Sequence, residues 1–195
     1  MSASIEKELT IKVSRVSIVI NILLTLMKLI AGVVAHSGAM VADAVHSAAD
    51  VFGYFLVIIG ANVSGKAADQ NHPYGHDRME CVISIVLANI LLLVGLGIGI
   101  SGLEKVIAGD YSQLAVPGRL ALMAAVISIV VKEGLFWYTR IAAKKINSVS
   151  LMAEAWHHRS DALSSIGSFA GILGARLGYP VLDPVASAVI AIFIL

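Results

Sequence analysis

The sequence contains little charge and almost no cysteine. Of its 195 residues, 14% are Asp, Glu, Lys or Arg, and Cys81 is the single cysteine. One thiol excludes a disulfide within the chain and any cysteine-rich metal site. The net charge of +1 gives no support for nucleic-acid binding. A secretory signal peptide is not expected either, because the first apolar run has no evident small-residue cleavage site.

Apolar residues, by contrast, are unusually abundant and account for 58% of the chain. Soluble domains average about 45–50% apolar and about 25% charged residues. The composition therefore favours an integral membrane protein surrounded by lipid. The length suggests one domain, so we expect residues 1–195 to form a single transmembrane domain.

Six apolar runs are candidate membrane spans, because about 20 apolar residues cross a bilayer. They cover approximately residues 11–35, 40–64, 81–108, 117–141, 150–177 and 181–195. The sequence therefore predicts an all-α, polytopic bundle of six transmembrane helices. The last run would rise only about 22 Å at about 1.5 Å per residue, so we expect the sixth helix to be truncated at the C-terminus.

Basic residues in the short loops predict the orientation of the bundle. If the N-terminus is cytosolic, the cytosolic segments contain eight Lys or Arg residues and the opposite segments contain three. Loops rich in Lys and Arg remain in the cytosol. We therefore expect a cytosolic N-terminus, in what we take to be a bacterial inner (plasma) membrane.

Two pairs of ionisable residues lie inside apolar runs. His46 and Asp50 are four residues apart in the second run, and His157 and Asp161 are four apart in the fifth. On a helix this spacing places both side chains of a pair on one face. A single buried His or Asp is more often a hydrogen-bonded packing residue. Two such pairs on two half-polar spans instead predict a metal site.

The chemistry of this predicted site suggests its cargo. Antiparallel packing of the second and fifth spans would place His46 level with Asp161, and Asp50 level with His157. Two nitrogens and two oxygens suit tetrahedral Zn²⁺, with Co²⁺ and Cd²⁺ as competitors and Mn²⁺ or Fe²⁺ as alternatives. Asp43, three residues before His46, could be a further ligand at the mouth of the site.

The same ligands also bind protons. A metal requires neutral imidazole and ionised carboxylate, so loading would displace protons from these groups. Histidine titrates near neutral pH, which suits it to carry the exchanged proton. We therefore expect alternating access, in which protons arriving from outside displace metal that was loaded from the cytosol.

A second group of potential ligands lies in the polar loop after the second span. Asp69, His72 and His76 are spaced i, i+3 and i+7. Their chemistry is compatible with weak binding of a divalent cation, and equally with solvated turn residues. Both interpretations remain open on chemistry alone.

Four motifs in register resemble the transmembrane part of the cation diffusion facilitator family. They are His46-x-x-x-Asp50, His157-x-x-x-Asp161, the loop His72-Pro-Tyr-Gly-His76-Asp-Arg-Met-Glu80, and the stretch Glu154-Ala-Trp-His-His-Arg-Ser-Asp161-Ala-Leu-Ser-Ser. The resemblance covers essentially the whole chain. It implies a homodimeric exporter with six helices per protomer that exchanges cytosolic divalent metal for protons.

The resemblance also implies roles for individual residues. His46, Asp50, His157 and Asp161 would form the transport site, and Asp69, His72 and His76 match a loop site of some bacterial members. Family members usually continue into a cytosolic C-terminal domain, which we expect to be absent from this chain. Bacterial zinc and cadmium members usually have Asp at the position of His46, whereas His there resembles many eukaryotic zinc transporters.

Two functions of other classes share some of these features. A membrane metalloenzyme would also place His and Asp in a bundle, but would leave one coordination position for water. No His-Glu-x-x-His motif is present, and we expect a secondary transporter rather than an enzyme. A passive metal channel is the other alternative, and saturable proton-coupled flux would distinguish it from a transporter.

Overall fold

The computed structural model describes residues 3–64, 79–109 and 114–194, and within these ranges the chain forms six helices and no strand. The helices are α1 (Ala3–Val34), α2 (Gly38–Ser64), α3 (Met79–Ile107), α4 (Arg119–Ile146), α5 (Val149–Arg176) and α6 (Leu182–Ile194). The predicted all-α bundle is confirmed. Each predicted apolar run corresponds to one helix.

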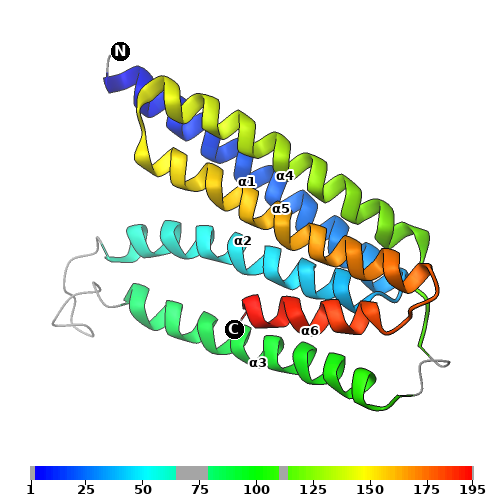
Figure 1. Cartoon of the computed structure of the whole chain (residues 1–195). Coiled ribbons are helices and arrows are strands. Elements are labelled where there is room, and N and C mark those ends of the chain that lie inside the picture. Colours follow the sequence, from blue (N-terminus) through cyan, green and yellow to red (C-terminus); the bar gives the residue numbers. More distant parts are fainter. Residues whose placement is uncertain (1–2, 65–78, 110–113, 195) are drawn as a thin grey trace.

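The helices are arranged in two groups. Figure 1 shows α1, α4 and α5 together on one side, and α2, α3 and α6 on the other. The groups meet mainly through α1 with α2 and through α5 with α6 and α2. The helices that carry the predicted ligands, α2 and α5, therefore lie at the boundary between the groups.

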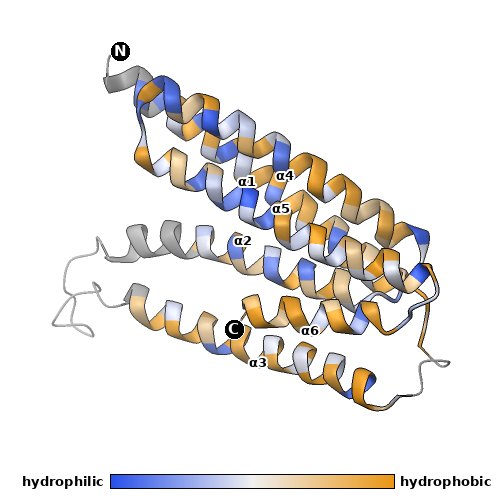
Figure 2. Cartoon of the chain, in the orientation of Figure 1, coloured by the Kyte–Doolittle hydropathy of each residue, from blue (hydrophilic) through white to orange (hydrophobic). Residues whose placement is uncertain are grey.

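The surface of the bundle is apolar and its interior contains charges, the reverse of a soluble domain. Leu23, Leu93 and Ile141 are each more than 60% exposed, whereas Lys28 and Lys132 are buried. Figure 2 shows that α3 and α6 are mostly hydrophobic and that hydrophilic residues interrupt α5 and the middle of α2. This distribution suits a protein that contacts lipid on its outside and polar groups on its inside.

Three helical segments in the described residues are long and apolar enough to cross a membrane on length and composition alone: 8–34, 84–107 and 119–146. Helices α2 and α5 have 27 and 28 residues, about 40 Å at about 1.5 Å per residue, which exceeds the hydrocarbon thickness of about 30 Å. Polar residues lower the hydropathy of α5. On α5 these residues face the interior, where Asp161, Ser165 and Ser168 are buried.

A tight connection joins α4 to α5. Asn147 adopts a left-handed conformation (φ 50°) at the end of α4, and Ser148 accepts a hydrogen bond from the Leu151 amide at the start of α5. Asn tolerates this backbone conformation and Ser is a preferred helix N-cap. The short turn fixes α4 antiparallel to α5, so residues equally distant from it lie level with each other.

Small residues allow the two groups of helices to approach closely. A Cβ atom at Gly171 of α5 would lie 2.3 Å from the Cβ atom of Ala186 on α6. At Gly32, in the last turns of α1, an added Cβ would lie 2.9 Å from the backbone nitrogen of Val41 on α2. These contacts hold α1, α2, α5 and α6 together at the end of the bundle that contains the α1–α2 turn, which we call the α1–α2 end.

Candidate metal centre

Three of the four predicted ligands converge within the bundle. His46 and Asp50 of α2 and Asp161 of α5 each place a potential ligand atom within 4.8 Å of the others. These are the distances over which side chains can share a metal ion after small adjustments. The His-x-x-x-Asp spacing on α2 points both of its side chains toward α5.

The fourth residue, His157, borders the same group. Its Nε2 lies 3.5 Å from Oδ1 of Asp50, and its Nδ1 lies 3.9 Å from Oδ1 of Asp161. Asp50 is thus beside His157, as the antiparallel arrangement of the two spans predicted. We refer to His46, Asp50, His157 and Asp161 together as the central cluster.

The carboxylate of Asp50 is incompletely hydrogen-bonded. Its Oδ2 is buried and has no hydrogen-bond partner among the described residues. Buried polar atoms in native proteins nearly always have a partner, because an unpaired one retains its full desolvation cost. An unpaired buried carboxylate oxygen is suited to ligate a cation.

Accessibility varies across the central cluster. The side chain of Asp161 is 3% exposed and that of Asp50 is 15% exposed, whereas that of His157 is 42% exposed. The cluster is therefore closed on the Asp161 side and accessible on the His157 side. An ion approaching from outside the protein would meet His157 first.

A lysine that sequence reasoning did not assign to the site contacts this cluster. The Nζ of Lys132, on α4, lies 2.5 Å from Oδ2 of Asp161, and both side chains are buried. The contact between Lys132 and Asp161 could have been predicted from their positions along the α4–α5 hairpin. Lys132 and Asp161 are nearly equidistant from the turn at Asn147 and Ser148, which predicts that they lie level.

Asp43 is engaged elsewhere. We expected a ligand at the mouth of the site, but Asp43 is fully buried and its Oδ2 lies 2.8 Å from Nζ of Lys28. Ser164, Ser165 and Ser168 also donate hydrogen bonds to this carboxylate. Since both oxygens already have partners, the geometry disfavours a ligand role for Asp43.

The two residues that follow His157 contact other helices. His158 is buried and its Nε2 lies 3.3 Å from the hydroxyl of Ser17 on α1. Arg159 pairs with Glu133 at 3.6 Å and stacks over the Phe136 ring at 4.6 Å. Both residues therefore link helices around the central cluster. The predicted loop ligands Asp69, His72 and His76 lie outside the described residues.

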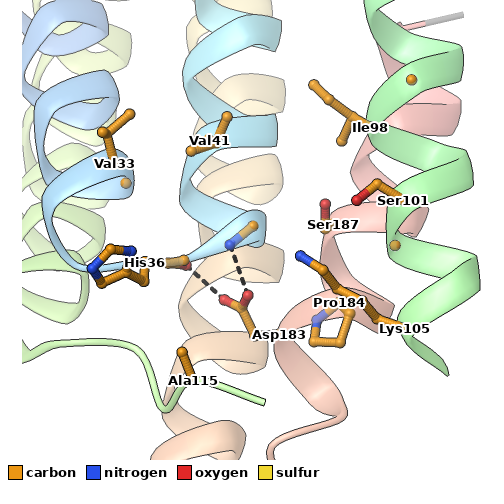
Figure 3. A pocket seen from close by; sticks show the side chains of 15 residues that line it. Val33, His36, Val41, Ile98, Ser101, Lys105, Ala115, Asp183, Pro184 and Ser187 are labelled. Atoms are coloured by element: carbon orange, nitrogen blue, oxygen red, sulfur yellow. Dashed lines mark hydrogen bonds between the residues drawn. The ribbon is translucent and has the colours of Figure 1, made fainter. Parts of the chain in front are cut away.

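A cavity of about 540 Å³ lies apart from the central cluster, at the α1–α2 end. Figure 3 shows His36, Lys105, Ser187 and Asp183 around it. Asp183 accepts hydrogen bonds from the Ser37 hydroxyl at 2.6 Å and from the Gly38 amide at 2.7 Å. Its carboxylate thus ties α6 to the first turn of α2.

Comparison with known proteins agrees with this architecture. The profile of the cation efflux transmembrane domain matches residues 14–195. An uncharacterized transporter of Methanocaldococcus jannaschii is 39% identical over 178 residues, which cover 91% of this chain and 62% of that protein. The manganese efflux system protein MneP of Bacillus subtilis is 35% identical over 199 residues, covering 98% of this chain and 66% of that protein.

The magnetosome protein MamB of Magnetospira sp. is 35% identical over 175 residues, covering 90% of this chain and 59% of that protein. The chain thus spans between 59% and 66% of the length of these three relatives. The profile match extends over nearly the whole sequence and coincides with the six-helix bundle. The chain therefore belongs to the cation efflux family, whose members are membrane metal transporters and not enzymes, and its residues 14–195 match the transmembrane domain of that family.

Proposed function

We propose that this chain is the metal-translocating domain of a divalent-metal exporter, and that the central cluster is its transport site. The observation that carries the proposal is that three potential ligands from α2 and α5 converge and that the imidazole of His157 borders them. Within the described residues, the buried Oδ2 of Asp50 has no hydrogen-bond partner. A cation bound between these groups would satisfy that oxygen. Its location inside an otherwise apolar bundle is typical of a substrate pathway.

We propose Zn²⁺ as the preferred cargo. A set of two nitrogen and two oxygen ligands, without thiolate, suits tetrahedral Zn²⁺, and Co²⁺ or Cd²⁺ can use the same set. Mn²⁺ is the second candidate, because relatives of this chain from Bacillus subtilis are named manganese efflux proteins. Fe²⁺ accepts the same ligand types and ranks below both.

Export would be coupled to protons that use the same ligands. Metal binding requires imidazole nitrogens and carboxylate oxygens that are free of protons, so the two cargoes compete for His46, Asp50 and His157. If the two conformations of the bundle differ in their relative affinity for metal and proton, a pH gradient drives metal outward. The boundary between the two helix groups is where such a movement would change access.

Three further proposals follow from the family and the sequence. We propose that Asp69, His72 and His76 form an additional cytosolic metal site, and that the protein acts as a homodimer. We also propose a cytosolic N-terminus in a bacterial inner membrane. Cross-linking of the purified protein would test the dimer, and accessibility of cysteines introduced into loops would test the orientation.

A flux assay in proteoliposomes tests the central proposal. The purified protein is reconstituted with a metal-sensitive dye inside, and Zn²⁺ uptake is measured with the lumen more acidic than the bath. We expect saturable uptake whose rate increases with the pH difference and falls when a proton ionophore abolishes the gradient. The same assay with Mn²⁺, Co²⁺ and Cd²⁺ ranks the cargoes.

Two variants serve as controls for this assay. Asp50→Asn should reduce uptake to the level of protein-free liposomes, because it removes a ligand charge. Glu104→Gln changes an exposed carboxylate on α3 and should transport like the wild type. Uptake that ignores the pH gradient would contradict antiport, and uptake that survives Asp50→Asn would contradict the assignment of the site.

A further inference from the structure

Two lysines are buried in the described part of the bundle, and each contacts an aspartate. Lys28 of α1 is 0% exposed and pairs with Asp43, and Lys132 of α4 is 1% exposed and pairs with Asp161. Buried charges are costly unless paired and hydrogen-bonded. The two pairs differ in how completely this condition is met, and that difference suggests a role for Lys132.

The Lys28 pair is fully hydrogen-bonded. The ammonium of Lys28 contacts Asp43 at 2.8 Å and donates to the hydroxyls of Ser47 and Ser165, both at 3.0 Å. An ammonium has three donors, and here each has an acceptor. Such saturation on both partners is expected of an ion pair that holds helices together.

Within the described residues, the Lys132 pair is less completely hydrogen-bonded than the Lys28 pair. Among the described residues, Asp161 is the one hydrogen-bond acceptor of the Lys132 ammonium. The other oxygen of Asp161, Oδ1, faces His157 at 3.9 Å. The carboxylate of Asp161 is thus shared between Lys132 on one side and the central cluster on the other.

We propose that Lys132 is a tethered cation that competes with the metal for Asp161 and thereby sets the affinity and selectivity of the transport site. This inference rests on the proposed function. With neutral imidazoles, Asp50, Asp161 and Lys132 carry a net charge of −1, which becomes +1 when a divalent cation binds. Without Lys132 the same groups would carry −2 and then 0, so Lys132 opposes loading electrostatically.

The same contact limits how Asp161 can ligate. Because Oδ2 is occupied by Lys132, Asp161 offers a single oxygen, Oδ1, to a metal in the cluster. One oxygen per carboxylate favours four-coordinate Zn²⁺ over Mn²⁺, which prefers more oxygen ligands. When the metal leaves, Lys132 keeps Asp161 from becoming an unpaired buried anion. Release is therefore easier than it would be from the two carboxylates alone.

Metal-binding calorimetry on the purified protein in lipid nanodiscs, with Zn²⁺ alone and Mn²⁺ alone, tests this proposal. Binding that is lost in Asp161→Asn is assigned to the transport site. We expect the uncharged variants Lys132→Gln and Lys132→Met to bind Zn²⁺ at least about tenfold more tightly than the wild type, since a repelling charge is removed. A residue with a merely structural role would weaken binding when replaced. The ratio of Zn²⁺ to Mn²⁺ affinity should fall, because Asp161 regains its second oxygen.

The Lys28→Gln variant is the matched control, because it removes an equally buried ammonium from an aspartate outside the cluster. It should reduce thermal stability while leaving Zn²⁺ affinity within about twofold of the wild type. Lys132→Arg keeps the charge but can occupy both oxygens of Asp161 with its planar fork. It should therefore bind Zn²⁺ at least about tenfold more weakly, and it provides the test if neither uncharged variant folds.

The results of these measurements distinguish a failure of the proposed transport site from a failure of the proposed role of Lys132. If the wild type lacks a site that depends on Asp161, the proposed transport site is wrong and the role of Lys132 falls with it. If that site exists but the uncharged variants bind Zn²⁺ equally or more weakly, or the Arg variant binds it equally well, the competition by Lys132 is overturned. An unchanged ratio of Zn²⁺ to Mn²⁺ affinity would overturn its effect on selectivity.

Discussion

The central cluster and the α1–α2 end each contain a carboxylate and a histidine, and they differ in how completely the carboxylate is hydrogen-bonded. In the central cluster, Oδ2 of Asp50 is buried without a partner among the described residues. At the α1–α2 end, both oxygens of Asp183 accept hydrogen bonds from the first turn of α2, beside a cavity that His36 also lines. Both places contain an aspartate and a histidine. Among the described residues, however, Asp50 has an oxygen without a hydrogen-bond partner, whereas both oxygens of Asp183 have one.

We propose that this difference distinguishes the proposed transport site from a structural contact. A carboxylate whose oxygens are satisfied by the protein contributes to stability and has little left to offer a cation. A buried carboxylate oxygen without a protein partner costs stability and retains the capacity to bind a cation or a water molecule. The same criterion places Asp43, with Lys28 and three serines around it, among the structural groups.

The largest effect that this comparison predicts is on metal affinity at Asp50. Asp50→Asn removes a ligand charge without changing the shape of the side chain, so we expect Zn²⁺ affinity to fall at least about 100-fold, or about 2.7 kcal/mol. Thermal stability of the metal-free protein should be unchanged or higher, because a poorly paired buried charge is lost. Calorimetry and thermal unfolding in detergent measure the two quantities. A large loss of stability with unchanged affinity would reverse the assignment.

A smaller effect of the opposite kind is expected at Asp183. Asp183→Asn retains one acceptor oxygen but loses the other, so one of its two bonds to α2 is lost. We expect destabilisation of about 1–3 kcal/mol and no change in Zn²⁺ affinity, by the same two measurements. Weaker Zn²⁺ binding in this variant would show that the α1–α2 end belongs to the metal pathway, and the contrast between the regions would then fail.

Much of the fold could be predicted because lipid imposes a simple pattern on sequence. The second predicted span, 40–64, and the fifth, 150–177, match α2 and α5 to within two residues at each end. Helix α1, however, begins at Ala3 rather than near residue 11. Hydropathy marks the portion of a helix that lies in the bilayer, and a helix can continue beyond it into water.

The convergence of the proposed ligands could be predicted for a similar reason. Pairs at i and i+4 share a helical face, and antiparallel spans bring Asp50 beside His157. The partner of Asp43 could not be predicted in this way, because Lys28 comes from α1, whose packing the apolar pattern does not specify. The partner of Asp161 could be predicted only in part. The α4–α5 hairpin places Lys132 level with Asp161, but whether the two side chains face each other depends on the rotation of their helices.

The central claim is that His46, Asp50, His157 and Asp161 share one ion, and the visible absorption of bound Co²⁺ tests it most directly. The measurement uses protein in which Asp69, His72 and His76 are replaced by alanine, so that the loop cannot contribute. Four-coordinate Co²⁺ held by two imidazoles and two carboxylates should give an intense tetrahedral spectrum at one ion per chain, and Asp50→Asn should abolish it. A weak spectrum of six-coordinate, largely hydrated Co²⁺, or a tetrahedral spectrum that survives Asp50→Asn, would contradict the claim.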